Sequence, residues 1–147
     1  MNYYNNGLAD LQKSYQTTQA LSKSYVERLK VEGRELDAKK AQQKGLEDSL
    51  KNLNKQYEKQ KKELDELVDK TNETTEKTTK SSEAYKKQQI RLNETATAIA
   101  KAKSETKKLQ DEMDILKITI LNLLLRYRRK IFLIMNIKKI STKHLQH

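Results

Sequence analysis

LEDSLKNLNKQYEKQKKELDEL, residues 46–67, is the stretch in which the apolar side chains of this sequence follow the clearest pattern. Its Leu and Tyr residues recur at spacings of three, four or seven positions, starting from Leu46 and ending at Leu67. Because an α-helix turns once in about 3.6 residues, these side chains fall on one face of a helix. The stretch therefore predicts an amphipathic helix whose apolar face must be covered by another helix.

The same seven-residue register extends outward from this stretch, from Leu8 to Leu116. A strict heptad drifts against the 3.6-residue turn, so a buried heptad stripe requires left-handed supercoiling around a neighbour. We therefore expect an all-α fold of long, extended coiled-coil helices, about 160 Å in length if the helix is continuous. The predicted coiled-coil seam consists of Leu8, Leu11, Tyr15, Tyr25, Leu29, Leu36, Leu46, Leu50, Leu53, Tyr57, Leu64, Leu67, Tyr85, Leu92, Ile99, Leu109 and Met113.

The composition agrees with extended helices better than with a compact globule. Charged residues make up 35% of the 147 residues and hydrophobic residues another 35%, with one Phe and no Trp. Such a chain has little material for a thick core. Pro is absent and only three Gly occur, so helix is favoured almost everywhere. Gly33 and Gly45 are expected soft points, each costing about 1 kcal/mol relative to Ala.

Residues 71–82, TNETTEKTTKSS, interrupt the apolar pattern. Ser and Thr hydroxyls compete for backbone hydrogen bonds, so helix formation is expected to be weakest here, and a hinge or hairpin bend is predicted. The charges that flank the seam show no consistent pairing, which leaves a dimer, a trimer and an intramolecular hairpin open. The predicted organisation is an N-terminal lead (1–7), a first coiled-coil segment (8–70), the Ser/Thr-rich hinge (71–82), a second coiled-coil segment (83–114) and a basic apolar tail (115–147).

The tail, residues 115–147, differs from the body of the chain. It contains eight Lys and Arg and no Asp or Glu, whereas residues 1–114 are nearly balanced. Its two apolar runs are each far shorter than the roughly 20 residues that span a bilayer. A basic surface contact through Arg126, Arg128, Arg129 and Lys130, with a membrane surface or nucleic acid, is one interpretation. The preferred hypothesis is that the tail is an out-of-frame translation after a frameshift, which sequencing of the encoding locus tests.

No motif for chemistry is found in the sequence. Cys is absent, and His144 and His147 lie in the tail without nearby carboxylates, which is poor material for a metal site. Phosphate-binding loops, nucleophile elbows and metalloprotease motifs are also missing. We therefore expect a non-enzymatic protein without cofactor, metal or small-molecule substrate. The N-terminus does not resemble a signal peptide, and no transmembrane helix is predicted.

Two stretches resemble a known family. LNKQYEKQKKELDEL (residues 53–67) and EAYKKQQIRLNETATAIAKAKSETKKLQDEMD (residues 83–114) are similar to the N-terminal coil of tail tape measure proteins from long-tailed phages and prophages of Gram-positive bacteria. These coils contain quasi-repeats with Tyr or Leu anchors and stretches similar to "L-N-x-x-A-T-x-I-A-K". The resemblance covers about residues 8–114, with residues 8–36 matching more loosely.

The resemblance implies a structural phage tail protein that acts in tail assembly and tail-length determination. Its implied partners are a phage tail tube protein, assembly chaperone proteins and further copies of the coil. Its implied location is the virion tail, or the host bacterial cytoplasm during assembly. Tape measure proteins continue for many hundreds of residues, so this chain is interpreted as a truncated or frameshifted fragment. The alternatives are a generic coiled-coil scaffold or linker protein and a membrane-surface or nucleic-acid adaptor that uses the basic tail.

Overall fold

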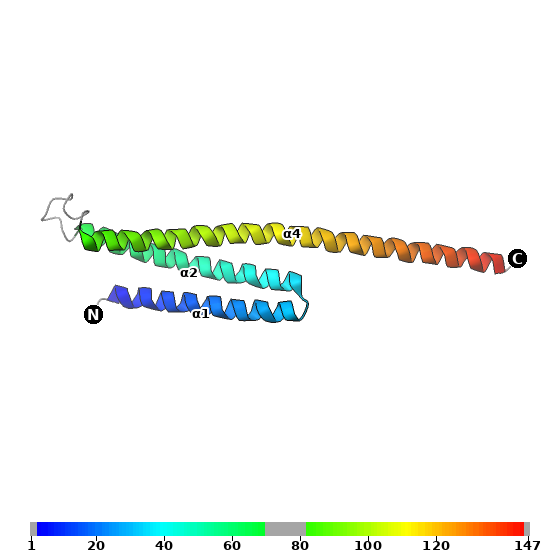
Figure 1. The fold of residues 1–147 in the computed structure, drawn as a ribbon, viewed down its shortest axis with the longest axis horizontal. Coiled ribbons are helices and arrows are strands. Elements are labelled where there is room, and N and C mark those ends of the chain that lie inside the picture. The colour runs from blue at the N-terminus through cyan, green and yellow to red at the C-terminus, as the bar shows by residue number, and fades with distance from the viewer. Residues whose placement is uncertain (1–2, 70–81, 146–147) are drawn as a thin grey trace. The chain divides into compact units, whose positions relative to one another are not determined.

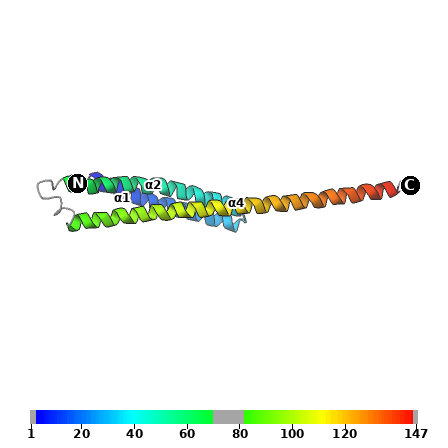
Figure 2. The ribbon, with the colours of Figure 1, turned by 90° about the horizontal axis from the view of Figure 1, so that it is seen from above.

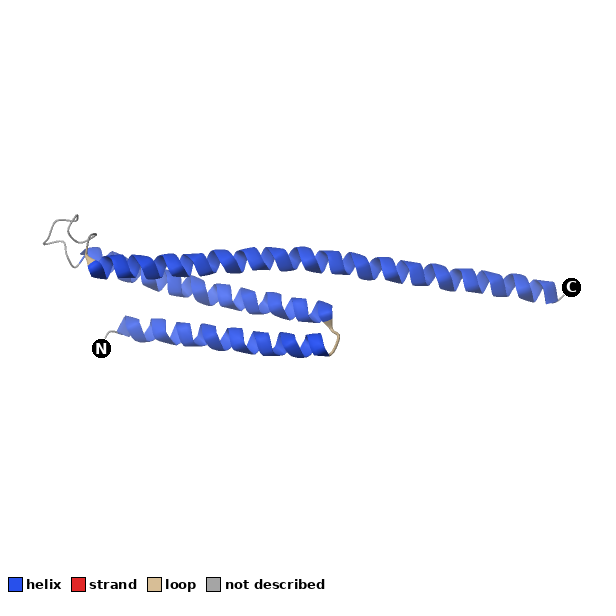
Figure 3. Ribbon diagram, viewed as in Figure 1, coloured by secondary structure: helices blue, strands red, loops and turns tan. Residues whose placement is uncertain are grey.

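A computed structural model of the chain describes residues 3–69 and 82–145. These residues form three helices, α1 (Tyr3–Val31), α2 (Glu35–Asp69) and α4 (Glu83–Leu145), and contain no strand (Figure 3). The predicted all-α fold is confirmed. The predicted hinge at 71–82 lies outside the described residues, except for Ser82.

Helices α1 and α2 form an antiparallel hairpin within a compact unit that comprises residues Met1–Gln110 (Figure 1). The apolar core of the hairpin lies near the turn, where Val26, Leu29 and Ala38 are buried together and Ala41 packs against them. Leu29 is fully buried, with 0% of its surface exposed. The two helices therefore cover each other's apolar faces within one chain.

The turn between α1 and α2 is built around Gly33. Its φ is 75°, a left-handed conformation that side chains with a Cβ rarely adopt. The amide of Gly33 donates to the carbonyl of Lys30 at 3.0 Å, and the amide of Arg34 donates to the carbonyl of Leu29 at 2.9 Å. This pair of bonds is a Schellman motif, which satisfies the last carbonyls of a helix and ends it. The single continuous helix considered from the heptads is therefore broken here, because the glycine terminates α1 and is not merely a soft point inside it.

Helix α2 starts directly after this turn, with carboxylates in its first turn. Glu35 and Asp37 are placed where the positive end of the helix dipole stabilises negative charge. The exposed Arg34 guanidinium donates from Nε to Asp37 Oδ2 at 3.0 Å. That hydrogen bond, with the charge of Asp37, raises the pKa of Arg34 above its ordinary value. This exposed ion pair links the residue that follows Gly33 to the first turn of α2.

Helix α4 begins at an N-cap. The hydroxyl oxygen of Ser82 accepts a hydrogen bond from the amide of Tyr85 at 3.2 Å, which satisfies one of the free amides of the first turn. From Glu83 the helix continues unbroken to Leu145, through the change of composition near Asp114 (Figures 1 and 2). Its residues are divided between two compact units, Met1–Gln110 and Asp111–His147.

Candidate helix-association surface

The predicted seam residues are almost all withdrawn from solvent. Tyr25 is the exception, because 47% of its surface is exposed and its ring lies 5.2 Å from the guanidinium of Arg28, while Val26 takes the buried position beside it. The buried seam residues are Leu8, Leu29, Leu53, Leu64, Leu92, Leu109 and Met113. The half-buried ones are Leu11, Tyr15, Leu36, Leu46, Leu50, Tyr57, Leu67, Tyr85 and Ile99.

Helix α2 has a second buried face, which the seam does not include. Ala38, Gly45, Ser49 and Gln56 are buried at spacings of seven, four and seven residues. At Gly45 the backbone of α2 lies so close to α1 that an added Cβ would meet the hydroxyl of Ser22 and would lie 2.7 Å from its Cβ. Gly45 therefore permits the two helices to approach each other, a role different from the soft point expected from the sequence.

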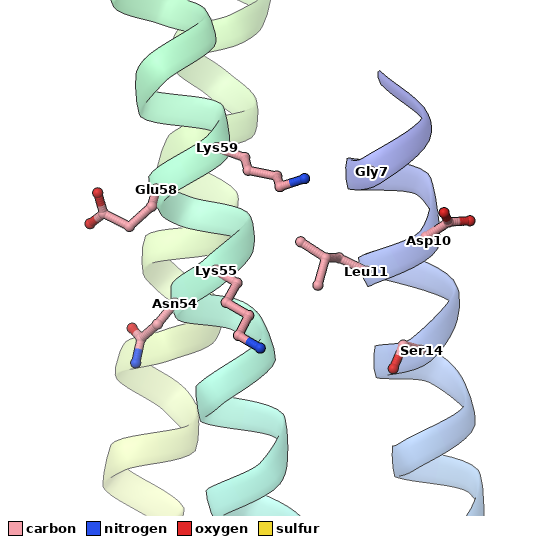
Figure 4. Close-up of a pocket in the computed structure, with 8 residues that line it drawn as sticks. All are labelled: Gly7, Asp10, Leu11, Ser14, Asn54, Lys55, Glu58 and Lys59. Atoms are coloured by element: carbon pink, nitrogen blue, oxygen red, sulfur yellow. The ribbon is translucent and has the colours of Figure 1, made fainter. Parts of the chain in front are cut away.

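The hairpin opens toward the N-terminus of α1, where a hollow of about 690 Å³ separates the helices (Figure 4). Leu11 projects from α1 into this hollow, and the Lys59 side chain reaches from α2 toward Gly7. Asp10 and Glu58 point away from it. Leu11 and the Lys59 side chain thus extend into the hollow, and neither Asp10 nor Glu58 is aimed between the helices.

Helix α4 buries one stripe in heptad register within the first unit. Gln88, Thr95, Ala102 and Leu109, spaced seven residues apart, are all at least nine-tenths buried. The Thr95 hydroxyl donates to the carbonyl of Arg91 at 3.2 Å. Because this bond satisfies the hydroxyl inside the helix, Thr95 can present its methyl group to the interface. Small residues at the seam therefore allow close helix contact, and a polar residue such as Thr95 keeps its hydroxyl hydrogen-bonded there.

Hydrogen bonds join α4 to α2 inside this unit. The Gln88 amide donates to the backbone carbonyl of Gln60 at 3.2 Å and to Glu63 Oε2 at 3.1 Å. The other side-chain oxygens, Gln60 Oε1 and Glu63 Oε1, are buried and have no hydrogen-bond partner among the described residues. Removal of one member of such a buried layer would leave polar groups of the other members without hydrogen bonds, which is costly.

A second polar bond joins the same helices nearer the hairpin turn. Gln43 of α2 donates to Gln110 Oε1 of α4 at 3.0 Å. Residue numbers rise along α2 from Gln43 to Gln60 while their α4 partners fall from Gln110 to Gln88. These two bonds therefore establish an antiparallel register between α2 and α4.

The predicted basic contact residues lie in the second unit, Asp111–His147. Arg126, Arg128, Arg129 and Lys130 are exposed on α4, and no ion pair is found for them among the described residues. The apolar residues around them are exposed as well: Leu124 and Ile134 expose 59% and 56% of their surface. The basic cluster is thus surrounded by uncovered apolar side chains.

Neither a metal centre nor a membrane span can be assigned to the described parts of the chain. Residues 3–69 and 82–145 contain no group of three or more His, Cys, Asp or Glu close enough to hold a metal ion. In the same residues no helix combines the length and the apolar character that crossing a bilayer demands.

The predicted seam does not include the face of α2 that packs on α1. Its buried members, Ala38, Gly45 and Ser49, are small or polar, so a search for Leu and Tyr at heptad positions passes over them. The available signal was the recurrence of small residues, together with Ala41, along one side of a long helix. Such residues let backbones approach, and they indicate a middle helix that contacts two neighbours.

Comparison of the chain with protein-family models, with curated proteins and with solved structures finds no match.

Proposed function

We propose that this chain is a structural, non-enzymatic helical protein of phage tail assembly, related to the N-terminal coil of tape measure proteins. One observation carries the proposal. The two stretches that resemble such coils, residues 53–67 and 83–114, supply the polar layer in which Gln88 bonds to Gln60 and Glu63. The motif residues are therefore used for helix–helix contact, which is the work expected of a structural coil.

The hairpin adds a condition to any role in tail-length determination. A helical protein that determines tail length does so through its extended length, which grows by about 1.5 Å for each helical residue. Two antiparallel helices such as α1 and α2 do not add their lengths. Under this proposal the hairpin opens when the tail tube polymerises around the chain, which exposes the Leu29 face to the tube or to other copies.

The encoding locus and a reconstitution test this function together. We expect genes for a tail tube protein and a tail assembly chaperone beside the gene for this chain. When those proteins are produced with it, we expect a complex that elutes as one species in size-exclusion chromatography. Neighbouring genes without a tail function, or separate elution of the three proteins, would contradict the proposal and favour a generic coiled-coil scaffold.

A matched pair of variants sharpens the reconstitution. Leu92 is a buried seam residue, whereas Ile90 is 56% exposed on the same turns of α4. Leu92→Asp should abolish the complex because it places a charge in the helix contact. Ile90→Asp should leave it intact. Equal loss in both variants would show that the seam does not select the partner.

A further inference from the structure

The second unit exposes apolar side chains on several sides of α4, and the most continuous set runs along one side between residues 120 and 134. At about 100° per residue, six residues between positions 120 and 134 fall within a sector about 100° wide. Each of the six is exposed by 39% to 65% of its surface. We call this set the apolar stripe: Ile120, Leu123, Leu124, Tyr127, Ile131 and Ile134.

Cations border the apolar stripe on both sides. By the same helical geometry, Lys117 and Arg128 fall just outside one edge and Lys130 falls just outside the other. Arg129 lies on the opposite side of the helix and Arg126 lies between it and Lys130, and residues 115–147 contain no carboxylate side chain. A ligand for this surface must therefore offer an apolar phase to the stripe and negative charge to both of its borders.

We propose that residues 117–134 of α4 bind the surface of a lipid bilayer that contains anionic phospholipids. The acyl boundary covers the apolar stripe, and the long Lys and Arg side chains extend to the headgroup phosphates. A polybasic helix is attracted to an anionic leaflet before it inserts. The helix lies in the plane of the surface, in agreement with the absence of a bilayer-spanning helix from the described residues. This proposal does not depend on the tail-assembly function.

Charge and apolar area favour this ligand over the others. A second copy would bring two acid-free segments together, with cations along both borders of the contact, and like charges in that arrangement repel. Nucleic acid would satisfy the cations but would leave the apolar stripe in water. An acidic groove on another protein could match both features, and the experiment below separates it from a bilayer.

Two triple variants in the same segment provide the central test. Ile120→Gln, Leu123→Gln and Leu124→Gln remove half of the apolar stripe. Ile118→Gln, Leu121→Gln and Leu125→Gln remove the same kinds of side chain from the opposite side, where exposures are 59%, 56% and 47%. Gln keeps a good helix propensity in both variants. The two variants therefore replace the same kinds of side chain and differ in the side of α4 that they change.

Binding of the full chain is measured by sedimentation with vesicles of phosphatidylcholine containing 40% phosphatidylglycerol, and with vesicles of phosphatidylcholine alone. We expect at least about tenfold tighter binding to the anionic vesicles, weakened by 0.5 M NaCl because salt screens the attraction. The stripe variant should lose about tenfold or more in affinity, and the opposite-side variant less than about threefold. Equal binding to both vesicles, or equal losses in the two variants, would overturn the proposal.

A fluorescence measurement keeps the test decisive if a triple variant fails to fold. The chain contains no Trp, so a single Trp reports one position. Tyr127→Trp places the reporter in the apolar stripe, and Phe132→Trp places it on the opposite side. On anionic vesicles we expect a blue shift and quenching by brominated acyl chains at position 127, and a smaller effect at position 132.

Three results would assign the surface to another ligand and overturn the proposal. The first is no vesicle binding together with dimerisation that the stripe variant abolishes, which indicates a second copy. The second is binding to duplex DNA that both triple variants retain and that exceeds binding to anionic vesicles. The third is binding to soluble polyglutamate, a probe for an acidic protein surface, at lower concentrations than to anionic vesicles.

Discussion

Residues 1–110 bury many of their apolar side chains, whereas most apolar side chains of residues 111–147 are exposed, with Met113 as an exception. In the first unit Leu29 is fully buried, and the apolar residues are diluted among charges but spaced to meet a facing helix. In the second unit Ile and Leu are more crowded, yet Leu123 and Leu124 expose 58% and 59% of their surface. The amount of apolar surface thus does not decide burial. Burial depends on the spacing of the apolar side chains and on a neighbouring helix with a matching face.

The largest expected effect comes from deleting the same side chain in each unit. Leu29→Ala should lower the free energy of unfolding by about 2–5 kcal/mol, because it removes a fully buried side chain and leaves a cavity. Leu123→Ala should change it by less than about 0.5 kcal/mol, because the side chain is largely exposed. Urea unfolding followed by far-ultraviolet circular dichroism measures both. Similar losses would mean that the two units do not differ in the way described.

Gly45 allows a test of the close approach between α1 and α2. Gly45→Ala should lower the free energy of unfolding by about 1–3 kcal/mol through overpacking against Ser22, although Ala is the better helix former. Gly7→Ala is the matched control, because its new methyl meets only the mobile end of Lys59 and should stabilise by up to about 1 kcal/mol. Thermal unfolding of the two variants gives the comparison. Stabilisation by both substitutions would contradict the contact at Gly45.

The polar layer between α2 and α4 can be probed one residue at a time. Gln88→Met keeps the size of the side chain but removes the donor to Gln60 and Glu63, so we expect a loss of about 1–3 kcal/mol. The same change at the neighbouring, half-buried Gln89 should cost less than about 0.5 kcal/mol. Denaturant midpoints of the two variants decide the matter, and a stabilised Gln88→Met protein would show that the layer only costs stability.

The smallest effect is expected at the hairpin turn. Gly33→Ala should cost about 1–2 kcal/mol because an L-residue is strained at a φ of 75°. Gly33→Asn should cost less, because Asn tolerates the left-handed region better than other residues with a Cβ. Differential scanning calorimetry resolves this order. A cost for Asn as large as that for Ala would argue against the left-handed turn.

The sequence was sufficient to predict the all-α fold, because a helical spacing of apolar residues can be counted directly. It did not predict the chain reversal at Gly33. A single glycine inside a helical pattern can either weaken a helix or end it, and only the facing helix decides which. The heptad register also continues across the turn from Leu29 to Leu36, which conceals the break.

The candidate surface was predicted less completely than the fold. Seam residues with large apolar side chains were identified, whereas Gly45, Ser49 and Gln56 were not, because their contribution depends on the closeness of α1. Gln88 was part of the heptad register, but its bonds to Gln60 and Glu63 require the antiparallel alignment of α2 and α4. From the sequence, the tail could be described only as rich in apolar residues, because the exposure of the apolar stripe is a property of the folded chain.

The distance between α1 and α2 is the most direct test of this account. The chain has no Cys, so Gln16→Cys and Lys51→Cys, both at exposed positions, accept spin labels at these two sites alone. Because packed helices lie about 8–10 Å apart, we expect a distance between the two spin labels below about 30 Å, measured by pulsed electron paramagnetic resonance. This distance should persist when labelled protein is diluted with unlabelled protein. A distance near 52 Å, as in about 35 residues of continuous helix, or its loss on dilution, would contradict the intramolecular hairpin.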